Sequence, residues 1–127
     1  MSSSSFWKDR RVLITGATGF VGGALARSLS NQGAYVVVGF HTFSECARRL
    51  AIDVRCIKMF DLDMRVAYDQ LRSIISGEEI EYVFHLAANS IVRSSSRDPM
   101  TTYRVNVMGT VELLEAARSV GGLKKII

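Results

Sequence analysis

The sequence predicts an α/β protein with a doubly wound parallel sheet, whose fifth strand has only begun where the chain ends. Short apolar or β-branched runs alternate with longer stretches in which apolar residues recur at helical spacing. A glycine-rich segment joins the first apolar run to the first helical stretch. Strands joined by helices of this length imply right-handed crossovers, and therefore a parallel sheet covered by helices on both faces.

The first half of the chain is expected to hold three strands and two helices. Val12–Ile14 is a short apolar run of the kind found in strands buried on both faces. A helix follows from Phe20 to Gln32, with Val21, Leu25 and Leu29 on its apolar stripe, and Gly33 ends it. The other expected elements are a β-branched strand over 35–38, a short helix over 44–50 with Ser44 as its N-cap, and a strand over 55–60.

The second half is expected to hold two helices and two strands. Val66, Leu71, Ile74 and Ile75 predict a helix over 65–76 that Gly77 ends, and a strand follows over 82–86. The longest helix is expected over 101–120, and residues 124–127 open the fifth strand. One stripe of that helix carries Tyr103, Val107, Val111, Leu114 and Ala117. Phe84 and Tyr103 are expected in the core.

Composition excludes several classes of protein and partner. With 127 residues, 48% hydrophobic residues and one proline, the chain suits one globular domain or part of a larger one. Its longest apolar run, residues 34–40, is far shorter than the roughly 20 residues of a membrane span, so no membrane partner is expected. The net charge of +4 is scattered rather than gathered in a basic stripe, so no nucleic-acid partner is expected either.

The cysteines and the N-terminus indicate the compartment. Two cysteines are too few for a disulfide framework, and neither they nor the histidines have metal-ligand spacing, so no metal is expected. The serine-rich start has neither the basic nor the apolar part of a secretory signal. A cytoplasmic protein is therefore expected, with residues 1–10 as an N-terminal tail.

The strongest chemical signal is the G-x-x-G-x-x-G spacing within Thr15–Gly22, placed between a strand and a helix. Gly16 permits the tight turn, Gly19 lets a pyrophosphate approach the backbone, and Gly22 lets the helix pack closely. The helix N-terminus adds free N–H groups and a positive dipole end. A plain structural turn is the alternative, but the strand and helix on either side favour a Rossmann-type dinucleotide-binding domain over residues 11–127.

Thr15–Gly22 resembles the nucleotide loop of the extended short-chain dehydrogenase/reductase family, the NAD-dependent epimerase/dehydratase group. Three further stretches agree with that family in order and spacing. Asp61–Leu62 resembles the pair whose acid bonds the adenine amino group, and His85–Ala88 resembles the H-x-A-A turn beside the nicotinamide ribose. Asn106–Thr110 resembles the N-V-x-G-T helix, whose asparagine supports the active site. The resemblance covers nearly all of residues 6–127.

Within the family, two details are similar to nucleotide-sugar 4,6-dehydratases of the CDP-glucose and GDP-mannose kinds. They are Phe6–Trp7 before the first strand, and His85–Arg93 with the later Asp98–Pro99. UDP-sugar epimerases share much of this pattern. The resemblance implies a nucleotide-sugar substrate, oxidised at C4 by a tightly held cofactor, and a homodimer formed through helices such as 101–120.

The residues expected to bind the cofactor combine these motifs with the end of the second strand. They are Gly16, Thr18, Gly19, Phe20, Val21, Gly22, His41, Arg48, Asp61, Leu62, Leu86, Ala87, Ala88 and Asn106. Plainer roles stay open for some of the motif residues. Asp61 would then cap a turn, His85 would be a core histidine with its hydrogen bonds satisfied, and Asn106 would be a surface residue. For Gly109, close packing of a helix is the expected reason.

Between NAD and NADP, the residues themselves favour NADP, and both stay open. A site specific for NAD places an acid at the end of the second strand, but residues 39–42 hold none. His41 and Arg48 lie close by, and the planar guanidinium of an arginine suits a 2′-phosphate, which favours NADP. Alternatively, Arg48 and Arg49 are the solvated end of a short helix. The resemblance to CDP-glucose dehydratases favours NAD.

No catalytic residue is expected within this chain. The family uses a Ser or Thr after strand five and a Tyr-x-x-x-Lys pair, in which the tyrosine is the general base. Here Tyr68 is followed four residues later by Arg72, and Tyr103 by Val107. Three interpretations remain: the cofactor-binding part of a nucleotide-sugar dehydratase (a lyase) or epimerase, a non-catalytic NAD(P)-binding or sensing module, and a remnant without function.

Overall fold

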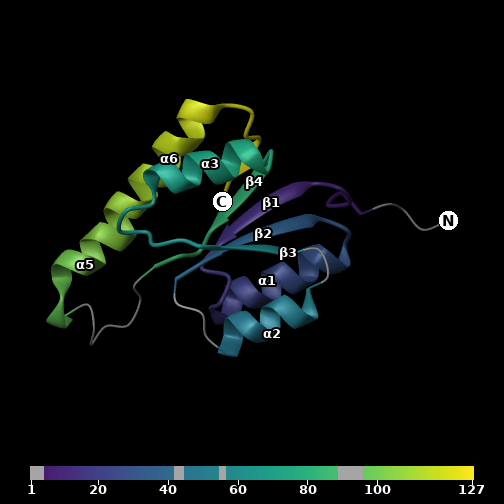
Figure 1. Cartoon of the computed structure of the whole chain (residues 1–127), viewed down its shortest axis with the longest axis horizontal. Helices are drawn as coiled ribbons and strands as arrows, with labels where there is room; N and C mark the ends of the chain where they lie inside the picture. The colour runs from purple at the N-terminus through teal and green to yellow at the C-terminus, as the bar shows by residue number, and fades with distance from the viewer. Residues whose placement is uncertain (1–4, 42–44, 55–56, 89–95) are drawn as a thin grey trace.

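A computed structural model describes residues 5–41, 45–54, 57–88 and 96–127. They form a parallel sheet of strand order β3-β2-β1-β4-β5 with helices on both faces, as Figure 1 shows. The strands are β1 (Arg11–Thr15), β2 (Tyr35–Phe40), β3 (Ile57–Asp61), β4 (Tyr82–His85) and β5 (Lys125–Ile126). The predicted doubly wound sheet is therefore confirmed, and the carboxyl ends of its strands meet at one edge.

The helices divide between the two faces of the sheet. They are α1 (Phe20–Asn31), α2 (Glu45–Asp53), α3 (Tyr68–Gly77), α5 (Pro99–Tyr103) and α6 (Gly109–Val120), with a π-helical turn η1 (Arg104–Met108) between the last two. Helices α1 and α2 cover one face, and α3 and α6 cover the other (Figure 1). The expected N-cap Ser44 and the expected strand residues 55 and 56 lie outside the described residues.

Strand β1 is buried on both faces because its side chains alternate between two cores. Val12 and Ile14 join Val36 and the helices α1 and α2 in one core. Leu13 joins Val83 and the helices α3 and α6 in the other. All three β1 residues are completely buried, as the continuous apolar run predicted.

Helix α1 has its predicted bounds almost to the residue, but its buried stripe differs from the prediction. Val21 is 64% exposed, whereas the buried positions are Gly22, Gly23, Ala26 and Leu29. The small residues face the sheet because they let the helix approach it closely. Gly33 adopts a φ of +88° directly after the helix, and its N–H donates to the Ser30 carbonyl at 3.0 Å, which confirms it as the stop.

The prediction for α3 was wrong at both ends. The helix begins at Tyr68 rather than Arg65, and Val66 is 75% exposed. Residues between β3 and α3 instead form a loop, in which the Arg65 N–H donates to the Asp63 carboxylate at 3.0 Å. Beyond the helix, Glu79 takes the left-handed conformation with φ of +51°, so the chain turns without using Gly77 for it.

The apolar stripe predicted for the long helix lies mostly on the outside. Tyr103 is 68% exposed, and Val107, Val111 and Leu114 are each about half exposed; of this stripe, only Ala117 is buried. The face that meets α3 and the sheet carries Gly109, Leu113, Ala116 and Ala117 instead. A Cβ on Gly109 would lie 2.9 Å from the Met64 carbonyl oxygen, so this glycine permits close packing against the loop after β3.

The residues just before β1 pack against the domain. The Trp7 ring lies 5.2 Å from that of Tyr82 and 5.8 Å from that of Phe84, centroid to centroid. This contact leaves Phe84 partly buried against the core, as expected. In the part of the chain that the structure describes, no helix is both long and apolar enough to cross a bilayer.

Candidate functional site

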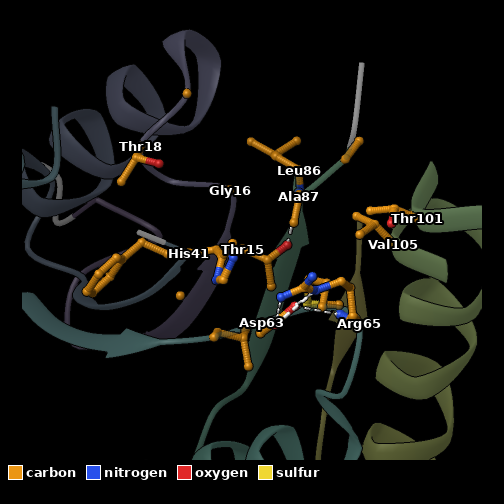
Figure 2. A pocket seen from close by; sticks show the side chains of 16 residues that line it. Thr15, Gly16, Thr18, His41, Asp63, Arg65, Leu86, Ala87, Thr101 and Val105 are labelled. Carbon is orange, nitrogen blue, oxygen red and sulfur yellow. Dashed lines mark hydrogen bonds and ion pairs between the residues drawn. The ribbon is translucent and has the colours of Figure 1, made fainter. Parts of the chain in front are cut away.

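A cleft of about 530 Å³ opens at the carboxyl edge of the sheet (Figure 2). Its walls come from the ends of β1, β2, β3 and β4, the glycine loop and the helix that begins at Pro99. The strand order reverses between β1 and β4, because β2 and β3 lie on one side of β1 and β4 and β5 on the other. Ligands of open α/β sheets bind at such a reversal point.

The three glycines of the loop serve three different purposes. Gly16 has a φ of +71°, and a Cβ there would lie 2.6 Å from the Leu86 carbonyl carbon, so any side chain would collide with backbone. A Cβ on Gly22 would lie 2.8 Å from the Ala17 Cα, which ties the helix closely to the loop. A Cβ on Gly19, by contrast, would meet only the Gly16 carbonyl oxygen, at 3.3 Å. Gly19 lines the cleft, so the space above it is open to a ligand.

The N-terminus of α1 presents backbone donors at the same place. Gly19 is the N-cap residue, no side chain of it can cap the helix, and the first turn holds no acid. The first N–H groups of a helix have no partner within it, so they favour an anionic ligand. Phe20 and Val21, at this helix end, are 95% and 64% exposed.

The opposite wall is the turn after β4, which β1 holds in place. Thr15 is completely buried, and its Oγ1 accepts hydrogen bonds from the Leu86 N–H at 3.1 Å and the Ala87 N–H at 3.2 Å. Figure 2 shows Thr15 beside Ala87. Leu86, Ala87 and Ala88 all line the cleft, where the family resemblance places the ribose contacts.

His85 stands behind this wall with both ring nitrogens engaged. Its Nδ1 lies 2.7 Å from Thr15 Oγ1, and its Nε2 lies 3.1 Å from Thr110 Oγ1. Burial lowers the pKa of the imidazole. The ring does not line the cleft, so the plainer of the two interpretations, a core histidine with its hydrogen bonds satisfied, describes its contacts.

The ends of β2 and β3 form the third wall. Gly39 lies against Leu62, whose Cδ2 would be 2.6 Å from a Cβ on the glycine. His41 lines the cleft, and its Nδ1 lies 3.8 Å from the Asp61 carboxylate. The Asp61 side chain is 76% exposed and lies outside the residues that line the cleft.

An ion pair that the sequence analysis missed lies in the same cleft. Arg65 binds the Asp63 carboxylate through Nε, at 2.9 and 3.0 Å from its two oxygens, and through Nη2 at 2.6 Å, as the dashed lines in Figure 2 mark. These bonds lower the pKa of Asp63 to about 2. The predicted helix over 65–76 included Arg65, so its spacing with Asp63 carried no signal.

The cofactor residues expected from sequence divide into two groups. Those that line the cleft are Gly16, Thr18, Gly19, His41, Leu62, Leu86, Ala87 and Ala88. Those outside its lining are Phe20, Val21, Gly22, Arg48, Asp61 and Asn106. The lining residues that were not expected are Thr15, Gly39, Phe40, Asp63, Met64, Arg65, Thr101 and Val105. A signal for several of these existed, because they sit at the ends of predicted parallel strands.

Arg48 pairs with a residue of its own helix. Its Nε and Nη2 bond both Glu45 carboxylate oxygens, at 3.0 and 2.8 Å, on the exposed side of α2. Asn106 is half-buried in η1, beside Val105, which does line the cleft. Within the described ranges, no three His, Cys, Asp or Glu side chains come together in a group that could hold a metal ion.

Comparison with known proteins gives consistent results. Residues 13–127 match the family model of GDP-mannose 4,6 dehydratase. The chain is 38% identical to CDP-glucose 4,6-dehydratase of Salmonella typhimurium, in an alignment that covers 100% of this chain and 36% of that protein. It is 36% identical to UDP-glucose 4-epimerase of Mycolicibacterium smegmatis, over 92% of this chain and 37% of the epimerase.

The fold matches a solved structure of the same group. UDP-glucose 4-epimerase from Brucella ovis, in complex with NAD, superposes with a TM-score of 0.75 at 31% identity, over 89% of this chain and 33% of that one. The chain thus spans about a third of the length of the relatives it matches. Because the family match covers nearly the whole chain and the parallel sheet agrees with it, the chain belongs to the GDP-mannose 4,6-dehydratase family of the extended short-chain dehydrogenases/reductases.

Proposed function

We propose that this chain binds NAD or NADP in the cleft, as the cofactor-binding part of a nucleotide-sugar 4,6-dehydratase or epimerase. The observation that carries the proposal is the open backbone at Gly19, where the N-terminus of α1 meets the strand-order reversal between β1 and β4. Relatives that match the chain include a CDP-glucose 4,6-dehydratase, and a UDP-glucose 4-epimerase in complex with NAD.

The residues present fit such a dinucleotide. The cleft of about 530 Å³ falls within the usual range of ligand pockets, roughly 300–1,000 Å³. Gly19 and the first amides of α1 would hold the pyrophosphate. His41 and Leu62 line the cleft at the ends of β2 and β3, and would hold one half of the cofactor. Leu86–Ala88, on the other side of β1, would hold the other half.

The proposed share of this chain in the reaction is binding and orientation. Held by these residues, a nicotinamide cofactor would supply a hydride acceptor for C4 of the sugar, the oxidation that prepares the sugar for elimination of water or for epimerisation. The chain has no Tyr-x-x-x-Lys pair to move a hydroxyl proton. Its apolar wall at Leu86 and Ala87 would exclude water from one side of the cofactor.

The contacts favour NAD over NADP. The Glu45 carboxylate already pairs with Arg48, so the arginine expected to bind a 2′-phosphate is engaged elsewhere. Asp61 lies 3.8 Å from His41 at the same end of the cleft, and its negative charge would repel a second phosphate. A ribose hydroxyl would instead find a hydrogen-bond acceptor there.

We also propose that the complete protein forms a homodimer through the outer face of the long helix. Tyr103, Val107, Val111 and Leu114 are each about half or more exposed along that face. A second copy would cover the same residues with its own helix, as the family resemblance implies. The nucleotide sugar remains the proposed substrate, and cytoplasm the proposed location.

The test is binding of NAD, NADP and ADP-ribose to the full 127-residue chain, followed by amide chemical shifts. Saturable shifts at Gly16, Gly19 and Leu86–Ala88, larger for NAD than for NADP at equal concentration, are expected. ADP-ribose should reproduce most of them, because it keeps the pyrophosphate. Shifts confined to residues outside the cleft, or none at millimolar NAD, would overturn the proposal.

A further inference from the structure

The cleft wall and the long helix are joined by one chain of hydrogen bonds that runs through His85. The chain starts at the amides of Leu86 and Ala87, which donate to Thr15 Oγ1 at 3.1 and 3.2 Å. Thr15 Oγ1 lies 2.7 Å from His85 Nδ1. On the far side of the ring, Nε2 lies 3.1 Å from Thr110 Oγ1, which donates to the Asn106 carbonyl at 2.8 Å.

The donors and acceptors in this chain allow a single neutral tautomer of His85. A threonine hydroxyl has two acceptor lone pairs and one proton. Thr110 Oγ1 donates its single proton to the Asn106 carbonyl at 2.8 Å, so towards His85 Nε2 it can only accept. The ring proton of the neutral imidazole therefore sits on Nε2, and the unprotonated Nδ1 accepts the proton of Thr15 Oγ1.

Protonation of the ring would break this arrangement. A proton on Nδ1 would face the Thr15 hydroxyl proton, which would have to turn away from the ring in a completely buried position. The groups around the ring are Thr15 from β1, Thr110 from α6, and the backbone of Ile127, whose carbonyl accepts the His85 N–H at 2.8 Å. Among the described residues, burial rather than a neighbouring charge lowers the pKa of the imidazole.

We propose that His85 is a positioning residue, which in its neutral Nε2–H form locks the cleft-lining turn Leu86–Ala87 to the π-helical turn at Asn106. This inference rests on the proposed function, since the turn it holds is part of the proposed dinucleotide site. The π-helical turn fits such a role, because π-helical turns within helices are frequent at functional sites. Cofactor affinity then falls as pH falls through the pKa of His85.

The first arm of the test reads the tautomer directly. The chain holds only two histidines, so long-range proton–nitrogen spectra of the ¹⁵N-labelled full chain resolve both, and the variant His41→Asn assigns them. His85 should show the Nε2–H pattern at pH 7.5 and titrate below the ordinary value of about 6.5. The Nδ1–H pattern, or a midpoint at or above 6.5, would overturn the proposal.

The second arm compares two matched threonine variants. Thr110→Val removes the acceptor of the His85 Nε2 proton, whereas Thr102→Val removes a hydroxyl that makes a similar bond, to the Asp98 carbonyl at 3.2 Å. Thr110→Val should weaken NAD binding by about fivefold or more at pH 7.5. Thr102→Val should match the parent, and Thr110→Ser should restore affinity. Equal affinity of the two valine variants would refute a positioning role.

The third arm separates this inference from the proposed function. Hydrogen exchange of the Leu86 and Ala87 amides needs no ligand, and it should accelerate in Thr110→Val but not in Thr102→Val, with circular dichroism confirming that both are folded. If the parent fails to bind NAD, the proposed function fails, and these exchange rates alone decide whether His85 holds the turn. Unchanged exchange in Thr110→Val would show that it does not.

Discussion

Valine at position 19 should separate binding of the cofactor from folding. Gly19 has φ of −76° and ψ of 172°, an extended conformation that valine adopts without strain. Its Cβ would come no closer to other protein atoms than 3.3 Å, to the Gly16 carbonyl oxygen. The loss of a good N-cap residue should cost about 1 kcal/mol. This is small beside the roughly 5–15 kcal/mol stability of a typical domain.

The effect on the ligand should be much larger. The valine methyl groups would occupy the open space at the N-terminus of α1, where the pyrophosphate is proposed to accept hydrogen bonds from backbone amides. A hydrogen bond to a charged group contributes roughly 1.5–3 kcal/mol. Loss of two such bonds would weaken NAD binding by about 3–6 kcal/mol, a factor of more than one hundred.

The matched control is Gly77→Val, because a Cβ at Gly77 would meet nothing within 4 Å and the residue lies in α3, outside the cleft lining. Calorimetric titration with NAD, beside urea unfolding of each variant, gives both quantities. Gly77→Val should bind like the parent. If Gly19→Val also bound NAD like Gly77→Val, while remaining folded, the assignment of the pyrophosphate to this loop would be refuted.

Four further predictions follow from the same contacts. Gly16→Ala should destabilise the fold by about 1–3 kcal/mol in urea unfolding, because φ is +71° and the new Cβ would meet the Leu86 backbone; stability equal to that of Gly19→Ala would contradict this. The lowered pKa of Asp63, about 2, means that its ion pair with Arg65 stabilises the fold above pH 4 and is lost as pH falls towards 2. Asp63→Asn should therefore reduce the dependence of the free energy of unfolding, measured in urea, on pH between 4 and 2. The reduction should be at most about 1 kcal/mol, since both side chains are partly exposed. In the complete protein, Leu114→Lys should shift sedimentation towards monomer, whereas Arg72→Lys on α3 should not. The purified 127-residue chain should form no 4-keto sugar from a nucleotide sugar, because it lacks the Tyr-x-x-x-Lys pair; detection of that product, free of host enzyme, would count against the proposed division of labour.

The order of the apolar runs was enough to predict the sheet, since the spacing of apolar residues in a strand or helix is a local property of the sequence. The Val12–Ile14 run, the three-glycine spacing and the stop at Gly33 each depend on residues a few positions apart. Half of the residues that line the cleft were predicted in the same way, because the carboxyl ends of parallel strands lie at one edge of the sheet. Gly16, Gly19 and Leu86–Ala88 are all found there.

Which apolar stripe of a helix is buried was decided only by the tertiary structure. The long helix carries apolar residues on more than one face, and the face with Gly109 and Ala116 packs inward because its small side chains allow α6 to approach α3 and the loop at Met64. Tyr103 and Val107 were left outside for that reason.

Hydrogen bonds between residues distant in sequence could not be predicted from the sequence either. Thr15, His85 and Thr110 lie 70 and 25 positions apart along the chain, yet one hydrogen-bonded line joins them. The bond between Arg48 and Glu45 is local, but its consequence for the cofactor depends on where α2 lies relative to the cleft. Sequence determined which residues were available at each strand end, and packing in three dimensions determined which of them face a ligand and which are already bound to one another.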